Sequence, residues 1–168
     1  QQGKLEKSAD YYLQATKIFE TIQDKRGVAG GFSNLSGIYY QQGNFKKSMQ
    51  YDLLSLKIFT QLSDKLGITT CLSNIGETYS DHGKYQKALE YYKRSLQIAL
   101  ETEDKYSIHY IYQKYAETYA KMGNMSGLLR SVRNDNYKKA YEYHQRYAQI
   151  KDSLFNEEKS KKNRQDGS

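Results

Sequence analysis

The sequence contains no proline and no tryptophan, and it has a single cysteine. The absence of proline excludes polyproline linkers and proline-interrupted helices, so long helical patterns can run unbroken. A single cysteine excludes an internal disulfide framework and a cysteine-ligated metal site. Because Cys71 falls on an apolar helical face among small residues, we expect it to be a buried, unreactive thiol.

Long apolar runs are also missing. No stretch approaches the roughly 20 apolar residues that a membrane-spanning helix needs, and the sequence shows no secretory signal peptide. We therefore expect no membrane segment. The compartment, cytoplasm or periplasm, stays open because a lone cysteine is compatible with both. The chain opens inside a repeat, so we expect a fragment whose natural start is missing.

Charge of one sign is not concentrated on the predicted helices, although the net charge is +7. Lysines and arginines are spread along the chain and often stand beside acidic residues, as in Glu6-Lys7 and Asp104-Lys105. This pattern is typical of solvated helix faces, and it lacks the basic stripe of a nucleic-acid-binding surface. We expect no nucleic-acid partner.

What the sequence does contain is a repeat. Gly3, Gly43, Gly83 and Gly123 are spaced forty residues apart, and a period of this size indicates a stacked repeat array. Glycine favours the left-handed conformation just past a helix C-terminus, so each of these glycines predicts a turn. Apolar residues at helical spacing then predict a first helix in each block, over 5–22, 45–62 and 85–100.

A second set of markers starts the other helix of each block. Asp24, Asp64 and Asp104 are good N-cap residues, because a carboxylate accepts hydrogen bonds from the free N–H groups of the first helical turn. Small residues such as Gly76 interrupt these second helices. Since glycine within a helix costs about 1 kcal/mol against alanine, we expect Gly76 to allow two helix backbones to approach closely.

The repeat resembles a known family. One unit places large, small and turn residues in the order Leu72, Ile75, Gly76, Tyr79, Gly83, Ala88, Tyr92 and Ser95, and the unit before it has Phe32, Leu35, Ser36, Tyr39, Gly43, Ser48, Asp52 and Ser55. This order resembles the tetratricopeptide repeat. The period of forty exceeds the usual period of about 34, and the closing proline is missing. In both departures the sequence resembles the long-helix branch of this family, which includes bacterial regulators, kinesin light chains and spindle-orientation adaptors.

The resemblance implies an all-α fold, a right-handed α-α superhelix of about seven helices. We expect a repeat array over 1–158, made of a truncated unit at 1–23 and units at about 24–62, 64–102 and 104–158. Residues 159–168 form a charged tail. The match to the helix at Tyr85 resumes only at Tyr137, so residues 125–136 are an insertion. It is either a tolerated surface insertion or a device for contact between two copies; the insertion and the last helix are the candidate surfaces for a homodimer.

No catalytic constellation is visible. His82, His109 and His144 are far apart in sequence, and there is no phosphate loop or dinucleotide fingerprint. We expect no enzyme activity, no cofactor and no metal in this sequence. A kinase or cyclase activity would belong to a domain outside it, since the last helix and tail are similar to the junction between a repeat array and the signalling helix of Bacteroidetes-type sensor proteins.

The resemblance also implies a concave groove lined by the helix that opens each unit. An Asn at the position of Asn34 and Asn74 grips the backbone of an extended peptide in relatives, because an amide both donates and accepts. The alternative is that these residues are merely polar and exposed. Gly30 and Thr70 lie in the same area, which lacks the lysine-rich carboxylate clamp of some relatives. The predicted groove residues are Ser33, Asn34, Tyr40, Ser73, Asn74, Glu77, Tyr110, Gln113, Lys114 and Glu117.

The resulting hypothesis is a scaffold that binds a protein or peptide, as the sensory or interaction region of a larger bacterial signal-transduction protein. Two alternatives stay open. The first is a stand-alone, peptide-responsive regulator. The second is a passive scaffold that holds an assembly together.

Overall fold

The chain is entirely α-helical in its regular structure over the residues that the structure describes. The computed structural model describes residues 2–123, 138, 142–143, 145–153, 156–157 and 159–160. Its bounded helices are α1 (Gln2–Thr21), α2 (Lys25–Gln41), α3 (Phe45–Gln61), α4 (Lys65–Asp81), α5 (Tyr85–Glu101) and α6 (Lys105–Gly123). Residues 145–153 form a further helical segment. The predicted all-α class with about seven helices is therefore confirmed.

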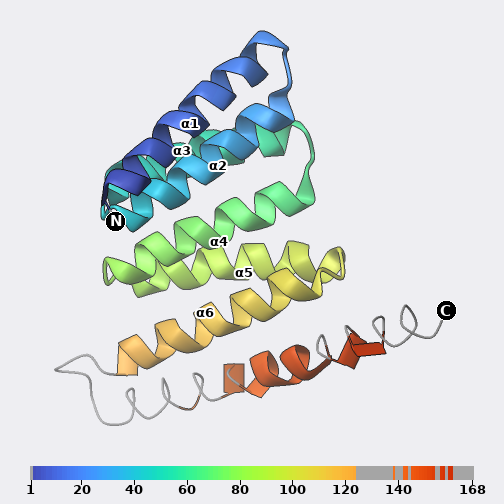
Figure 1. Cartoon of the computed structure of the whole chain (residues 1–168). Coiled ribbons are helices and arrows are strands. Elements are labelled where there is room, and N and C mark those ends of the chain that lie inside the picture. The colour runs from blue at the N-terminus through green and yellow to red at the C-terminus, as the bar shows by residue number, and fades with distance from the viewer. Residues whose placement is uncertain are drawn as a thin grey trace. The chain divides into compact units, whose positions relative to one another are not determined.

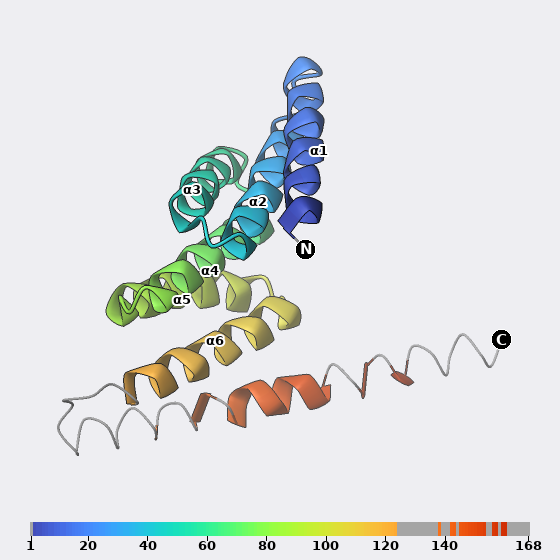
Figure 2. The ribbon, with the colours of Figure 1, turned by 60° about the vertical axis from the view of Figure 1, so that its left-hand side comes forward.

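The chain divides into two compact units, Gln1–Ser95 and Leu96–Ser168, with the boundary inside α5. In the first unit, consecutive helices pack against one another: α1 on α2, α2 on α3 and α3 on α4 (Figure 1). Helix α2 lies between α1 and α3 (Figure 2). α2 also contacts α4, so α2 and α4 meet along one side of this unit.

Glycine closes α2 and α4 as predicted. Gly43 and Gly83 have φ of +73° and +70°, and the amide of each donates back to a carbonyl of the preceding helix, Tyr40 O at 2.9 Å and Ser80 O at 3.0 Å. The turn predicted at Gly3 is wrong, because α1 already begins at Gln2 and Gly3 lies within it. Gly123 is the last residue of α6, and the segment after it lies outside the described residues.

The aspartate caps are also confirmed. Asp24 Oδ1 accepts from the backbone N–H of Gly27 at 2.9 Å, Asp64 Oδ1 from Gly67 at 3.0 Å, and Asp104 Oδ1 from Ser107 at 3.2 Å. The residue before each cap is left-handed without being glycine: φ is +59° at Gln23, +52° at Ser63 and +53° at Glu103. The second turn of each block thus combines a left-handed residue with an aspartate cap.

Asp64 carries the cap that is reinforced from another helix, because its Oδ2 also pairs with Arg26 Nη2 of α2 at 2.9 Å. We expect Asp64→Ala to lower the free energy of unfolding by about 1–2 kcal/mol, most of it from the lost cap, since exposed ion pairs contribute little. Urea denaturation followed by circular dichroism measures this. Asp10→Ala, at an exposed position within α1, is the matched control. Equal stability of the two variants would contradict the prediction.

Small residues in the first unit make room for rings of the neighbouring helix. A Cβ added at Gly67 would come within 2.4 Å of the Phe59 ring, and one added at Gly27 would come within 2.4 Å of the Phe19 ring. At Gly76 the added Cβ would lie 2.5 Å from Tyr92 Cε1. The close approach expected at Gly76 is therefore to a buried side chain of α5 rather than to a second helix backbone.

Buried serines tie the helices of the first unit together at the repeat spacing. Ser55 Oγ donates to the carbonyl of Ala29 at 2.8 Å, and Ser95 Oγ donates to the carbonyl of Thr69 at 2.8 Å. Because the Ser55 proton is used in that bond, the Cys71 thiol donates to Ser55 Oγ at 3.2 Å. Cys71 is buried as predicted, and burial raises its pKa to about 12, so the thiolate is not available at neutral pH.

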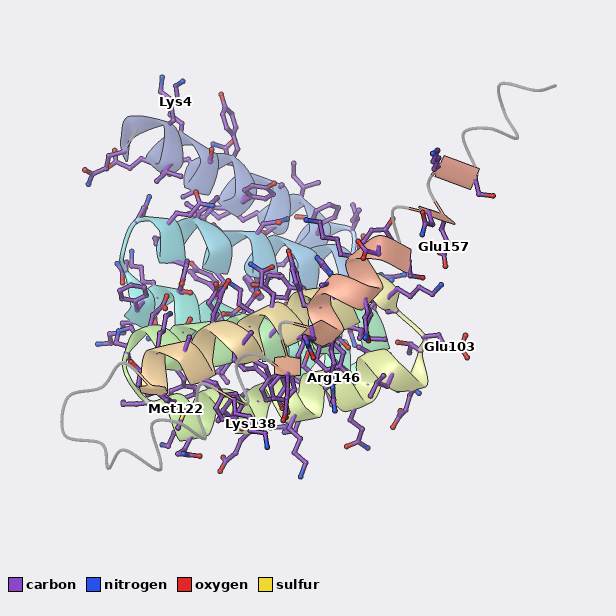
Figure 3. The ribbon with its side chains drawn as sticks, turned by 90° about the horizontal axis from the view of Figure 1, so that it is seen from below. Lys4, Glu103, Met122, Lys138, Arg146 and Glu157 are labelled. Atoms are coloured by element: carbon purple, nitrogen blue, oxygen red, sulfur yellow. The ribbon has the colours of Figure 1, made fainter. Side chains whose placement is uncertain are left out.

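The second unit joins α6 to the C-terminal helical residues through aromatic side chains. The Tyr143 ring stacks on the Tyr115 ring with centroids 4.4 Å apart, and the His109 ring stacks on the Tyr147 ring at 4.1 Å. Figure 3 shows Arg146 on the C-terminal helical segment. Its guanidinium lies 5.7 Å from the centre of the Tyr143 ring. The insertion at 125–136 lies outside the described residues. None of the described helices has the length and apolar character needed to cross a membrane.

Candidate functional site

A groove lies between the exposed sides of α2 and α4. This α2–α4 groove has a volume of about 310 Å³. Residues spaced three and four apart bring one side of each helix to it, as the helical period requires. The lining residues are Arg26, Gly30, Ser33, Asn34, Phe59, Asp64, Leu66, Gly67 and Thr70.

One end of the groove is defined by the pair between Arg26 and Asp64. The Arg26 side chain is 72% exposed and the Asp64 side chain only 11% exposed, so the carboxylate is fixed while most of the guanidinium faces solvent. Asp64 is held twice, by Arg26 and by the amide of Gly67 that it caps. The groove therefore has an anchored polar end and an apolar floor that includes Phe59 and Gly67.

The structure places Ser33 and Asn34 in this groove. Asn34 is exposed and Ser33 is half-buried, so both side chains are accessible to a bound molecule. An exposed amide supplies donors and an acceptor, which suits it to the backbone of an extended chain. The position of these two residues agrees with the predicted groove, while their role as peptide ligands stays a prediction.

Asn74 lies one helical turn beyond the groove residue Thr70 on α4. It is half-buried, and its amide nitrogen donates to Oδ1 of Asp52 at 3.3 Å. Asn34 and Asn74 occupy equivalent positions in the repeat, but their surroundings differ. The acceptor for Asn74 is a carboxylate from α3 that is only 1% exposed.

Ser73 does not belong to the exposed face, so its predicted place in the groove is wrong. Its side chain is 3% exposed and lies 2.8 Å from Ser95 Oγ of α5. Since the Ser95 proton already goes to the carbonyl of Thr69, Ser73 is the donor in this bond. Ser73 therefore ties α4 to α5, and substituting it would test packing rather than ligand contact.

Tyr40 and Glu77 mark the other end of this side of the unit. Tyr40, near the C-terminus of α2, donates its hydroxyl to Asp81 of α4, which ties the ends of the two helices together. Burial raises the pKa of Tyr40 far above its ordinary value, and the bond to Asp81 and the charge of Glu77 add to the shift. Tyr40 therefore acts as a neutral donor that bridges α2 and α4.

Sequence reasoning placed Asp52 in the repeat pattern but assigned it no role near the groove. Burial raises the pKa of its carboxyl to about 7 from an ordinary value of 3.8, against the Ser36 hydroxyl and the Asn74 amide, which lower it. The signal was present in the repeat, because the residues forty positions before and after it are Tyr12 and Tyr92. An aspartate at a repeat position that otherwise holds tyrosine indicates a role specific to this unit.

The predicted residues of α6 belong to the second unit and form a polar cluster of their own. Gln113 Nε2 donates to Glu117 Oε1 at 2.8 Å, and Lys114 Nζ lies 3.2 Å from Glu117 Oε2. The same Lys114 ammonium lies 5.3 Å from the centre of the Tyr110 ring. All four side chains are half-buried and engaged with one another.

Among the described residues, no group of three or more His, Cys, Asp or Glu side chains is arranged to hold a metal ion. The groove residues include amide, hydroxyl and guanidinium groups, which bind by hydrogen bonding. Arg26, Asp64, Phe59, Leu66 and Gly67 also line the groove, although the sequence analysis did not assign them to it.

Comparison with known proteins agrees with this architecture. Residues 27–101 match the family model of the tetratricopeptide repeat. No curated protein sequence matches the chain. The crystal structure of BtubC (BKLC) from P. vanneervenii is similar with a TM-score of 0.67 at 16% identity, over 90% of this chain and 75% of that chain. The crystal structure of the apo form of RapI is similar with a TM-score of 0.58 at 18% identity, over 87% of this chain and 64% of that chain.

At such identities the two solved structures bear on the fold alone. The chain spans 64% of the RapI chain, which is less than two thirds, and it spans 75% of the BtubC chain. The matched range 27–101 includes every lining residue of the α2–α4 groove except Arg26. Residues 27–101 therefore match the tetratricopeptide repeat, and the described helices share the fold of these two solved structures.

Proposed function

We propose that the α2–α4 groove binds an extended peptide, either free or as a segment of a partner protein. The observation that carries this proposal is the presence of Asn34, Ser33 and Thr70 in one groove of about 310 Å³ with a partly apolar floor. An extended backbone presents alternating N–H and C=O groups, and amide and hydroxyl side chains can satisfy both. The volume suits a few residues of a peptide, in the range of small ligand sites.

The charges of this face favour a ligand that carries no cluster of negative charge. Arg26 is paired with Asp64, and Glu77 and Asp81 lie on α4 beyond the groove. A peptide with a neutral or basic sequence meets no electrostatic penalty there, whereas an acidic C-terminal tail does. The absence of a lysine clamp near Gly30 and Thr70 supports the same choice.

The test is a selection from a random octapeptide library on the purified chain, followed by affinity measurement with a resynthesised peptide. We expect Asn34→Ala to weaken binding about tenfold, the effect of losing one to two hydrogen bonds to an amide. The far-ultraviolet circular dichroism spectrum should stay unchanged because Asn34 is exposed. Gln86→Ala, an exposed amide on α5, is the matched control. Undiminished binding by Asn34→Ala would contradict the proposal.

We also propose the sensory role in a bacterial signalling protein, in which binding is passed to the C-terminal helical segment. The packing of 145–153 against α6 through His109 and Tyr147 supports it, because a change in α6 has a direct physical route to this segment. Peptide binding should then slow amide exchange in 145–153. Unchanged exchange with intact binding would leave a passive scaffold or a stand-alone regulator.

Sedimentation equilibrium tests the predicted homodimer, and a monomer at all concentrations would contradict it.

A further inference from the structure

The polar chain beneath the α2–α4 face begins at buried hydroxyls and ends at an accessible amide. Ser48 Oγ lies 3.0 Å from Ser36 Oγ, the Ser36 hydroxyl is a neighbour of the Asp52 carboxyl that lowers its pKa, and Asp52 Oδ1 accepts from Asn74 Nδ2 at 3.3 Å. Ser36, Ser48 and Asp52 are each 1% exposed, whereas Asn74 is half-buried. Asn74 is therefore the member of this chain that a bound molecule can reach.

An ionised carboxylate only accepts hydrogen bonds, so it admits one orientation of a neighbouring amide. With Asp52 ionised, the nitrogen of Asn74 must face the carboxylate. The amide oxygen then lies on the opposite side of the side chain. A neutral carboxyl both donates and accepts, so it admits either orientation of Asn74.

We propose that Asp52 is a positioning residue, whose carboxylate holds the nitrogen of Asn74 inward and leaves the amide oxygen on the α4 face to accept a hydrogen bond from a peptide N–H group. The inference rests on the proposed binding of a peptide to this face, and it deepens that proposal by naming what orients one of its contacts. Asp52 does not touch the peptide; it acts through Asn74.

The repeat itself supplies the comparison. In the next unit the place of Asp52 is taken by Tyr92, whose ring fills the space beside Gly76, and in the preceding unit it is taken by Tyr12. At Ser36, the equivalent of Gly76, the small residue carries a hydroxyl that meets the carboxyl. The pair Ser36 and Asp52 thus replaces an apolar contact by a polar one at the point where α3 lies beneath α2 and α4.

Proton binding to Asp52 makes this orientation depend on pH. The groups around the carboxyl are the Ser36 hydroxyl from α2, and Asn74, Glu77 and Cys71 from α4; the charge of Glu77 raises the Asp52 pKa, and Asp52 raises that of Cys71. Oδ2 of Asp52 is buried without a hydrogen-bond partner, which disfavours the ionised form. Burial brings the pKa to about 7, so both orientations of Asn74 are populated below neutrality and one dominates above it.

The first experiment needs no ligand. Side-chain amide resonances of the ¹⁵N-labelled chain are followed from pH 5.5 to 8.5, with Asn74→Ala identifying the Asn74 pair. We expect the Asn74 pair to titrate with a midpoint near 7 in the wild type and to stay constant in Asp52→Asn. The Asn34 pair, whose repeat has Tyr12 instead of a carboxylate, should not titrate with this midpoint. An Asn74 pair that ignores pH, or one that titrates equally in Asp52→Asn, would overturn the inference.

The second experiment uses one selected octapeptide, acetylated, amidated and free of histidine so that it does not titrate in this range. Its affinity for the wild type should rise about two- to threefold from pH 6 to pH 8, because the protonated carboxyl admits both orientations of Asn74 and leaves only part of the molecules competent to bind. Asp52→Asn should bind it without this pH dependence, and so should Asn74→Ala, more weakly. A titrating Asn74 with a pH-independent affinity would overturn the link to binding.

The two experiments separate the two proposals. Failure to select any peptide would count against the proposed function, and the amide titration would still decide whether Asp52 orients Asn74. Conversely, a peptide that binds with the same affinity at pH 6 and pH 8 would confirm binding and refute the role of Asp52. A merely structural role for Asp52 predicts lower stability of Asp52→Asn but no change in the pH profile.

Discussion

Tyr92→Ala should lower the free energy of unfolding by about 3–5 kcal/mol, the usual cost of truncating a buried aromatic side chain. Tyr92 is the largest side chain of the described residues that is fully buried, and its ring packs directly against the helix backbone at Gly76. Its removal leaves a cavity between α4 and α5 that two rigid helices cannot close. Urea denaturation monitored at 222 nm measures the loss.

The matched control is Tyr11→Ala, the same truncation at a residue that is 71% exposed on α1. It should change the free energy of unfolding by no more than about 0.5 kcal/mol.

A second comparison uses Gly76→Ala. In the wild type the new methyl group meets the Tyr92 ring and destabilises the fold, whereas in the Tyr92→Ala background the ring is gone and alanine regains its helix propensity of about 1 kcal/mol. A loss below 1 kcal/mol for Tyr92→Ala would contradict the assignment of this pair.

The repeat pattern predicted the helix pairs well because the residues that end and start helices have strong local chemistry. Gly43 and Gly83 adopt the left-handed conformation for which glycine is best suited, and Asp24 and Asp64 use the carboxylate that an N-cap requires. The left-handed residues Gln23, Ser63 and Glu103 were missed. Residues other than glycine adopt the left-handed conformation at a cost in conformational free energy. Tertiary packing has to offset that cost, and the local sequence does not show at which residues it does so.

The candidate site was harder to predict, because local sequence does not decide what faces a groove. The dipeptide Ser-Asn occurs at 33–34 and again at 73–74, yet Ser33 lines the groove while Ser73 is buried against α5. The two dipeptides are identical, and the residues that pack around them differ. Asn34 is exposed, and Asn74 is held by a carboxylate that comes from a different helix.

Asp52 shows most clearly how little of the site local sequence can predict. The repeat pattern placed it among the positions of the repeat unit but gave it no role, and aspartate is rarely buried. The structure buries it in the column that holds tyrosine elsewhere, next to Ser36 and Asn74. A departure from a repeat at a buried position was the available signal, and its physical meaning needed the contacts across three helices.

The same carboxyl should make the stability of the fold depend on pH in an unusual direction. The folded-state pKa of Asp52, about 7, lies above its ordinary value of 3.8. The stabilisation from the bound proton is therefore complete below pH 3.8 and is lost as the pH rises through 7. Relative to Asp52→Asn, the wild type should lose roughly 2–3 kcal/mol of unfolding free energy between pH 5 and pH 8.

Urea denaturation of both proteins at each pH isolates this effect, because all other titrating groups are common to the pair and cancel in the difference. Asp10→Asn, at an exposed position on α1, should instead follow the wild type in parallel at every pH. The curves for the wild type and Asp52→Asn should converge at low pH if the protonated carboxyl and the amide are equivalent in the core. A difference that stays constant from pH 5 to pH 8 would mean that Asp52 remains ionised, and the orientation of Asn74 would then be fixed at every pH in this range.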